Sequence, residues 1–177
     1  FAMLNGSWKL KTIDAAGTTG LYSSLGQDPA TGRFAVAYAS STGAIKYATQ
    51  ASDLSWKVVI IARGGAGSGY VSLAFDQAKM PAVSFYDGGG QNLRFAHLIG
   101  GIWQSQTIAN TPVEGLYSQL FFDDQDRAVV FYYNKTYSKV FSATGDIGSW
   151  SYGLKLDQGG SWLSAARDGA GDTVLCA

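Results

Sequence analysis

The chain has 177 residues, enough for one ordinary domain with a buried core, and its 46% hydrophobic and 14% aromatic residues exclude disorder. Charged residues make up only 15% and the 13 basic residues balance 13 acidic ones, so nothing indicates a nucleic-acid partner or an anionic membrane surface. No apolar run approaches the roughly 20 residues of a membrane helix, so we expect no membrane insertion. A single cysteine, Cys176, excludes an internal disulfide framework and a CxxC metal site, and we expect neither metal nor cofactor.

In chain order, residues 1–14 predict two strands, which match the third and fourth strands of the later repeats. Three repeats follow, 20–61, 68–108 and 115–156, and each predicts four strands. A turn rich in Asp, Gly and Pro separates the first two strands of each repeat, and the fourth strand contains a Trp. Residues 160–177 supply only a first and a second strand, ending at "TVLCA".

Four series of residues give this repeat its period. The tryptophans are spaced by 48, 47 and 47 residues: Trp8, Trp56, Trp103 and Trp150. Aromatic residues at the start of the first strands are spaced by 48, 47 and 45: Tyr22, Tyr70, Tyr117 and Trp162. Two further series keep similar intervals: Asp28, Asp76, Asp123 and Asp168, and Val36, Val83, Val129 and Val174. Four series in phase indicate a tandem structural repeat of about 47 residues.

Four-stranded units of this length, rich in glycine and aromatic residues, are typical of the blades of an all-β β-propeller. A barrel or sandwich with a similar number of strands would not require the four matched series. We therefore predict one β-propeller domain over residues 1–177, built of four-stranded antiparallel blades. If the two terminal pairs of strands share one blade, the ring has four blades and a Velcro-like closure that removes both free edges. The other interpretation is a part of a larger propeller, completed by further blades or by another chain.

The pattern "GYVSLAFD…PAVSFYD…NLRFAHL…GIW" resembles the tandem repeats of bacterial sialidase-like or lectin-like β-propeller proteins. The recurring phrase of those repeats is a Gly-Tyr-x-Ser-Leu-x-x-Asp strand, a Tyr-Asp strand and a Leu-Lys-Tyr-Ala strand, and the match covers essentially the whole chain. The resemblance implies blade architecture rather than an activity. The Asp-box of true sialidases, Ser-x-Asp-x-Gly-x-Thr-Trp, is absent; "TGDIGSW" at 144–150 is its nearest approach and lacks the leading Ser-x-Asp.

A glycosidase needs two carboxylates facing one sugar ring, about 5–9.5 Å apart. The recurring Asp series begins tight turns, where Asp commonly accepts backbone hydrogen bonds, so we expect it to be structural. Asp87, in "DGGGQN", and Glu114, the only Glu, do not repeat, and they are the alternative catalytic pair of a sialidase-like glycoside hydrolase or lyase. Solvated loop carboxylates are the ordinary interpretation of both. His97, the only His, has no partners for a triad or a metal site and is expected to pack or to lie at the surface.

The aromatic series opens the innermost strand of each blade, near the central channel and the loop-bearing face. Polar residues follow two positions later: Ser24, Ser72, Gln119 and Ser164. Aromatic rings stack on sugar faces, and hydroxyl or amide groups bind sugar hydroxyls, so these eight residues are the predicted ligand-binding set. One site per blade would give multivalent glycan recognition. The alternative is that the aromatic residues pack one blade against the next.

The predicted function is a non-catalytic recognition module that binds a glycan or protein partner at the loop-bearing face. A chain low in charge and rich in Ser, Thr, Gly and Tyr favours an extracellular or cell-surface location. Two glycosylation sequons, at Asn5 and Asn134, are expected in loops. A third hypothesis is a purely structural repeat segment of a larger surface protein or assembly.

Overall fold

The computed structural model describes residues 2–168 and 172–177, and within these ranges every regular element is a β-strand. The first sheet is a hairpin of β1 (Ala2–Asn5) and β2 (Ser7–Leu10). The second contains β3 (Thr19–Gln27), β4 (Phe34–Ser40), β5 (Ala44–Gln50) and β6 (Trp56–Arg63). The third contains β7 (Gly69–Phe75), β8 (Pro81–Asp87), β9 (Asn92–Ile99) and β10 (Ile102–Ala109). The fourth contains β11 (Glu114–Phe122), β12 (Ala128–Asn134), β13 (Lys139–Asp146) and β14 (Ser149–Leu156). The last is a hairpin of β15 (Ser164–Arg167) and β16 (Thr173–Cys176).

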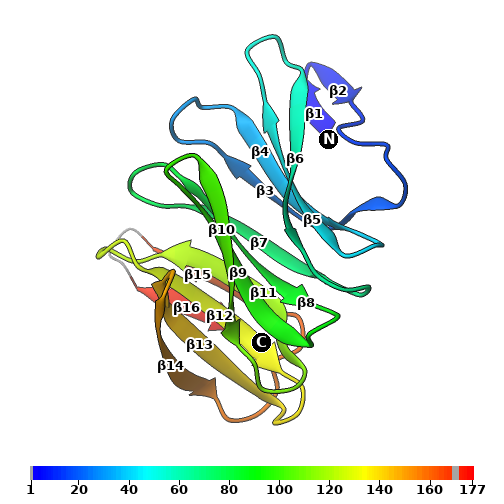
Figure 1. Ribbon diagram of the computed structural model, residues 1–177. Coiled ribbons are helices and arrows are strands. Elements are labelled where there is room, and N and C mark those ends of the chain that lie inside the picture. Colours follow the sequence, from blue (N-terminus) through cyan, green and yellow to red (C-terminus); the bar gives the residue numbers. More distant parts are fainter. Residues whose placement is uncertain (1, 169–171) are drawn as a thin grey trace.

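The three four-stranded sheets are antiparallel meanders that follow one another in chain order, and Figure 1 shows them stacked as successive blades. This is the all-β propeller architecture that the repeat predicts. In the part of the chain that the structure describes, no helix is long and apolar enough to cross a membrane.

The core lies between the blades. One cluster joins Ala37 and Tyr47 of the first four-stranded sheet to Val83 and Phe85 of the next. A second cluster continues on the other face of that sheet, where Phe95 packs with residues of β11 and β12. Because a blade is covered on both faces, its second strand is apolar almost throughout, and six of the seven residues of β4 are buried.

The recurring aspartates hold the turns between first and second strands. The Asp28 Oδ1 accepts a hydrogen bond from the Ala30 backbone N–H at 2.7 Å, and Asp123 Oδ1 accepts one from Gln125 N–H at 3.0 Å. The short side chain of Asp mimics a backbone acceptor in such a turn. These hydrogen bonds give the aspartates the structural role in turns that the sequence predicts.

Strand register corrects the valine series. Val36 pairs with Leu25 and Val83 with Leu73, but Leu120 of the next blade pairs with Val130 rather than Val129. Two valines are adjacent there, and an apolar pattern does not distinguish them. In the last hairpin the same position belongs to Leu175, one residue after Val174.

The loop placement expected for the sequons is also wrong. Asn5 is the last residue of β1 and Asn134 the last residue of β12. The Asn134 side chain is only 1% exposed, so it is a packed polar group rather than an accessible acceptor.

The two terminal hairpins form separate two-stranded sheets: in Figure 1, β1–β2 lies beside the β3–β6 sheet and β15–β16 overlaps the β11–β14 sheet. The N-terminal end lies along the first four-stranded sheet, where Lys11 Nζ donates a hydrogen bond to the Leu54 carbonyl at 2.6 Å. At the other end, Arg167 of β15 donates to the Phe122 carbonyl of β11 at 3.3 Å. A shared blade would need a ladder between the hairpins, and the described strands form none.

Candidate functional site

Two pockets occupy equivalent positions at the junctions between blades. The first, of about 460 Å³, opens between β10 and the β11–β14 sheet, and the second, of about 410 Å³, opens between the residues after β2 and the β3–β6 sheet. Each is lined by the Ile five residues after the recurring Trp, Ile108 in one and Ile13 in the other. Each is also lined by the fifth residue of a second strand, Tyr132 or Tyr38. The pocket is therefore a feature of the repeat, and its remaining lining differs from one junction to the next.

Glu114 provides the polar centre of the first pocket. Its side chain is buried, and its carboxylate accepts hydrogen bonds from the Thr111 backbone N–H and from Asn134 Nδ2, the latter at 3.2 Å. The Asn134 Oδ1 accepts a further bond from the Tyr137 N–H at 3.1 Å, which fixes the orientation of the amide. Burial raises the pKa of Glu114, since the two hydrogen bonds offset the desolvation of the carboxylate only in part.

Aromatic side chains form the wall of the same pocket. Tyr132 stacks on Phe141 with ring centroids 6.1 Å apart, and Tyr137 meets Phe141 edge-on at 6.5 Å. Tyr152 Oη donates a hydrogen bond across the junction to the Ile108 carbonyl at 2.6 Å. The first pocket thus combines a buried carboxylate and an amide with several ring surfaces.

The second pocket is built around an ion pair. Asp14 Oδ2 lies 2.7 Å from Lys46 Nζ and accepts a hydrogen bond from Tyr38 Oη at 2.9 Å, while Asp14 Oδ1 accepts one from the Ala16 N–H. The hydrogen bond from Lys46 is the main cause that lowers the pKa of Asp14 to about 2. This junction carries a charge pair where the first carries Glu114 and aromatic rings.

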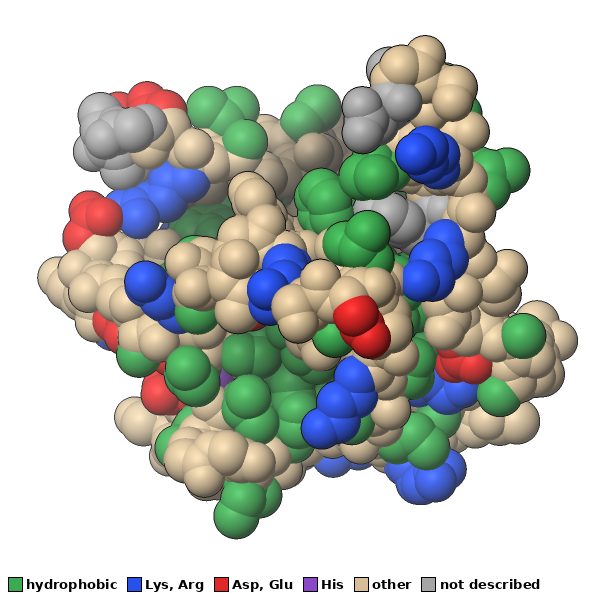
Figure 2. Space-filling view, turned by 90° about the horizontal axis from the view of Figure 1, so that it is seen from above, with side chains coloured by type: hydrophobic (Ala, Val, Ile, Leu, Met, Phe, Trp, Pro, Cys, Tyr) green, Lys and Arg blue, Asp and Glu red, His purple; other side chains and the backbone are tan. Residues whose placement is uncertain are grey.

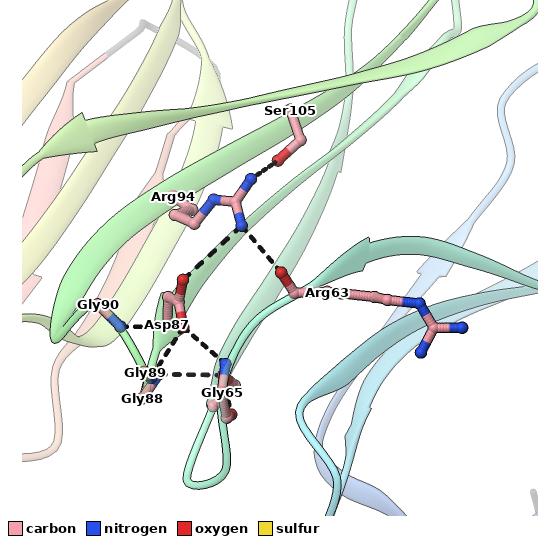
Figure 3. Close-up of polar contacts among 9 residues, drawn as sticks. Arg63, Gly65, Asp87, Gly88, Gly89, Gly90, Arg94 and Ser105 are labelled. Atoms are coloured by element: carbon pink, nitrogen blue, oxygen red, sulfur yellow. Dashed lines mark hydrogen bonds and ion pairs between the residues drawn. The ribbon is translucent and has the colours of Figure 1, made fainter.

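At the middle junction an arginine replaces these groups. Arg94 is the third residue of its strand, as Lys46 and Phe141 are of theirs. Its guanidinium donates to the Arg63 carbonyl at 3.0 Å and to Ser105 Oγ at 2.9 Å, and it lies 5.5 Å from the centroid of the Phe85 ring (Figure 3). The side chain therefore spans this junction and links its strands.

Asp87 anchors the loops beside Arg94. Its Oδ1 accepts backbone hydrogen bonds from Gly65 at 2.8 Å, Gly89 at 2.9 Å and Gly90 at 3.3 Å (Figure 3). Burial opposes ionisation, but these bonds together with Arg94 hold the pKa of Asp87 below its ordinary value. Asp87 is not among the residues that line the pocket of Glu114, so the two carboxylates of the alternative enzyme do not face one cavity. Within residues 2–168 and 172–177, no group of three or more His, Cys, Asp or Glu side chains is placed to hold a metal ion.

The structure brings the predicted aromatic residues together as one ladder. Ring centroids are 4.6 Å apart for Tyr22 and Tyr70, 4.5 Å for Tyr70 and Tyr117, and 5.1 Å for Tyr117 and Trp162. All four have left-handed backbones, with φ from 51° to 67°, and the three tyrosines lie at irregularities in strand pairing. Burial is the main cause that raises the pKa of Tyr70, and neighbouring hydroxyls contribute. The ladder lines a hollow of about 260 Å³.

The polar residues predicted beside the ladder have mixed environments. Ser24 Oγ accepts a hydrogen bond from the Leu73 N–H at 3.0 Å, and Ser72 Oγ accepts one from the Leu120 N–H at 2.9 Å. Both hydroxyls therefore link one blade to the next. Gln119 is half-buried at the hollow, and Ser164 is exposed.

His97 is buried between two carboxylates. Its Nε2 lies 3.1 Å from Asp76 Oδ2 and its Nδ1 lies 3.2 Å from Asp146 Oδ1. Asp76 belongs to the same blade and Asp146 to the next, so the ring bridges two blades. This is the packing role expected of His97 and not the surface alternative.

Several residues at the pockets were not predicted from the sequence. Tyr38, Tyr132 and Phe141 line the pockets, and Lys46 pairs with the lining residue Asp14. All four lie on second and third strands, whose sequence indicates only blade structure. A usable signal exists in the repeat itself: one equivalent position carries Lys46, Arg94 and Phe141, three chemically different residues. Variation at this position marks where the three junctions differ in chemistry.

No protein-family model and no curated protein matches the chain by sequence. Solved structures match the chain by fold. SapL1 lectin in complex with α-methyl fucoside has a TM-score of 0.64 and 14% identity, over 85% of this chain and 50% of the lectin. A mutant Aleuria aurantia lectin in complex with α-methyl-L-fucoside has a TM-score of 0.58 and 18% identity, over 88% and 51% of the two chains. AofleA from Arthrobotrys oligospora has a TM-score of 0.57 and 12% identity, over 96% and 49%. The chain spans about half the length of each of these proteins, and at such identities the likeness shows that it shares their β-propeller fold.

Proposed function

We propose that the chain is a non-catalytic β-propeller module that binds glycans in the pockets between its blades. The observation that carries the proposal is the recurrence of one pocket at equivalent junctions, with a buried hydrogen-bonding group at its centre. Sugar hydroxyls bind carboxylates and amides, and the apolar faces of sugars pack on aromatic rings. The pocket of Glu114 offers both kinds of surface.

Fucosylated glycans are the ligand class that we propose first. The matched lectins were solved with α-methyl fucoside, and Aleuria aurantia lectin also with Fucα1-6GlcNAc. Figure 2 shows one face of the molecule, where charged side chains of both signs are scattered and hydrophobic side chains gather in the middle, and a neutral ligand suits such a surface. Such ligands, with the low-charge composition, support an extracellular or cell-surface location.

The aromatic ladder is a second proposed contact surface. Its two inner rings, Tyr70 and Tyr117, each contact two neighbouring rings at interplanar angles of 44–58°, so a ligand in the hollow would meet parts of the rings and their hydroxyl groups. Ser24 and Ser72 each keep one hydroxyl proton to donate. Tyr70→Phe tests this surface separately from the pockets, because it removes one hydroxyl and keeps the ring.

The hydrolase or lyase alternative rests on Glu114, whose raised pKa suits a general acid. A second carboxylate facing the same sugar is required. The sialidase-like part of the resemblance therefore has less support than the lectin-like part. A protein partner, or a purely structural role in a longer array of blades, becomes the better proposal if no glycan binds.

The test is calorimetry with α-methyl fucoside and a panel of neutral glycans. Glu114→Gln keeps the shape of the side chain but removes its charge, and we expect affinity at the first pocket to fall at least about tenfold. Tyr137→Ala removes part of the wall, where the ring is 55% exposed and contributes little to the fold. The matched control is Asp157→Asn, a 73% exposed carboxylate outside the pocket, which should bind as the wild type does.

Circular dichroism shows whether each variant keeps its fold. If the folded wild-type chain binds no glycan, the proposed function is wrong. If it binds and Glu114→Gln binds equally well, the function stands but the site lies elsewhere.

A further inference from the structure

One pair of facing positions recurs in the three four-stranded sheets. The fifth residue of each second strand pairs with the third residue of the third strand: Tyr38 with Lys46, Phe85 with Arg94, and Tyr132 with Phe141. Two of these third-strand residues are cations, and the last is a phenylalanine. Because the strand pairing is the same in all three sheets, the junctions differ here only in their side chains.

Each of the two cations has a carboxylate beside it. Lys46 Nζ lies 2.7 Å from Asp14 Oδ2. Arg94 Nη1 lies 3.7 Å from Asp87 Oδ2 (Figure 3). A carboxylate that is taken out of water is stabilised in its ionised form by such a partner. At these two junctions the protein itself supplies the positive charge.

The third sheet keeps a carboxylate but not the cation. Glu114 is only 4% exposed, and it lines the pocket together with Phe141. None of the described residues that line this pocket is Lys, Arg or His. Lys139, two residues before Phe141 on β13, is paired with Asp157 at 2.5 Å. The Glu114 carboxylate therefore has hydrogen-bond donors around it but no cation among the lining residues.

Aromatic rings stand where the cation is missing. Phe141 lies 6.1 Å from Tyr132 with its ring plane at 23°, and Tyr137 meets it edge-on at 6.5 Å. The faces of such rings attract cations. An ionised carboxylate has about four acceptor positions, and the hydrogen bonds that Glu114 accepts do not use all of them. A buried carboxylate among aromatic rings is suited to the ammonium group of a ligand.

The pocket is larger than an ammonium group alone requires. Its volume of about 460 Å³ lies within the range of about 300–1,000 Å³ that is typical of small-molecule sites. Tyr137 and Tyr152 line it and are 55% and 58% exposed, so their rings are open to a ligand. The apolar face of a sugar packs on aromatic rings of this kind. An ammonium group carried on a sugar ring would use both the carboxylate and the rings.

We propose that the pocket of Glu114 prefers a hexosamine with a free amino group, whose ammonium group supplies the charge that Lys46 and Arg94 supply at the other junctions. The ammonium group donates a hydrogen bond to the Glu114 carboxylate, while the sugar ring packs on Tyr137. This proposal rests on the glycan-binding function proposed above and names the sugar class for this one pocket. A neutral or N-acetylated sugar brings no charge, so it leaves the buried carboxylate without a cation.

The experiment is calorimetry of the whole chain near neutral pH with glucosamine, N-acetylglucosamine, glucose and choline. Most amino groups of this kind carry a proton at that pH. We expect the wild type to bind glucosamine at least about tenfold more tightly than the two neutral sugars, because a charge-assisted hydrogen bond is stronger than a neutral one. Choline carries a cation without a sugar ring, so it should bind more weakly than glucosamine.

Two variants remove the preference by different routes. Glu114→Gln removes the negative charge, and Phe141→Lys places in the third sheet the cation that Lys46 provides in the first. In both variants glucosamine should lose its advantage over glucose. The matched control is Asp53→Asn, which removes one negative charge from an exposed turn between β5 and β6 and should bind as the wild type does.

Circular dichroism shows whether each variant is folded, and if Phe141→Lys is not, Glu114→Gln carries the test. A wild type that binds glucosamine no more tightly than glucose overturns the proposal, and so does a preference that Glu114→Gln keeps. Choline that binds as tightly as glucosamine overturns the assignment to a sugar. The glycan-binding function fails only if no glycan binds at all, so the two failures are distinguishable.

Discussion

Asp14 illustrates how one carboxylate connects the N-terminal segment to the first four-stranded sheet. Lys46 and Tyr38 hold its Oδ2, and the pKa of Asp14 falls from 3.8 to about 2. A carboxylate with a depressed pKa contributes stability above its unfolded-state pKa and loses it as pH falls through the folded-state pKa. The contribution of Asp14 is therefore complete near neutral pH and disappears between about pH 4 and pH 2.

Asp14→Asn tests this linkage. We expect the variant to melt about 2–4 °C below the wild type at pH 7, which corresponds to about 1 kcal/mol for an ion pair at the rim of a pocket. The difference should shrink toward zero near pH 2, where the wild-type carboxyl group is protonated. Thermal melts followed by circular dichroism measure it, and Lys46→Met should reproduce the loss at pH 7. An equal loss at both pH values would show that the charge is not responsible.

At the scale of strands, His97 connects two neighbouring blades. It lies on β9, contacts Asp76 after β7 in its own blade, and reaches Asp146 at the end of β13 in the next. Each ring nitrogen lies within hydrogen-bonding distance of a carboxylate oxygen, so the imidazole links the two blades. Phe95 and Phe122 enclose it.

His97→Leu fills much of the same space but offers no hydrogen-bonding group, so Asp76 Oδ2 loses its partner while Asp76 Oδ1 keeps the Met80 N–H. We expect the free energy of unfolding to fall by about 2–3 kcal/mol. Urea denaturation provides the measurement. In Asp146→Asn, where the side chain is 51% exposed and the amide keeps an acceptor and a donor, the loss should stay below about 1 kcal/mol. The contacts of His97 with Asp76 and Asp146 have no stabilising role if His97→Leu is as stable as the wild type.

In the whole molecule, stability should be highest in the middle blade. The β7–β10 sheet is packed on both faces, contributing Val83 and Phe85 to one core cluster and Leu93 and Phe95 to the other. The described side chains of β2 are all exposed. In a stack where each blade contacts only its neighbours, opening begins at the ends.

Hydrogen exchange followed by mass spectrometry tests this gradient. Peptides from β8 should exchange at least about 100-fold more slowly than those from β1–β2, with β4 and β12 at intermediate or similar rates. Exchange by β8 as fast as by β1–β2 would contradict the prediction.

Much of the architecture could be predicted because the residues that build a blade repeat. Each blade must turn at an Asp, present an aromatic residue to its neighbour and bury its second strand, so Asp28, Tyr70 and their equivalents mark the blades. The strand register is harder to predict, since Val129 and Val130 are adjacent and both are apolar. The valine series fails for that reason.

The candidate site is harder to predict from the sequence than the fold, because its residues come from two blades that only folding brings together. Glu114 looks like an ordinary loop carboxylate, and only packing against Asn134 and Thr111 buries it. In the sequence Asp87 looks like the same kind of loop carboxylate, but three backbone N–H groups donate hydrogen bonds to it, and it holds the adjoining loops in place.

The sequence by itself therefore determined the strand order, the period and the blade architecture, because turn residues and apolar patterns are local features of the sequence. The tertiary structure decided which polar groups meet, which of them lose contact with water and which faces stay uncovered. Burial and hydrogen-bond partners depend on distances between residues that are often 20 or more positions apart, and no local pattern specifies those distances.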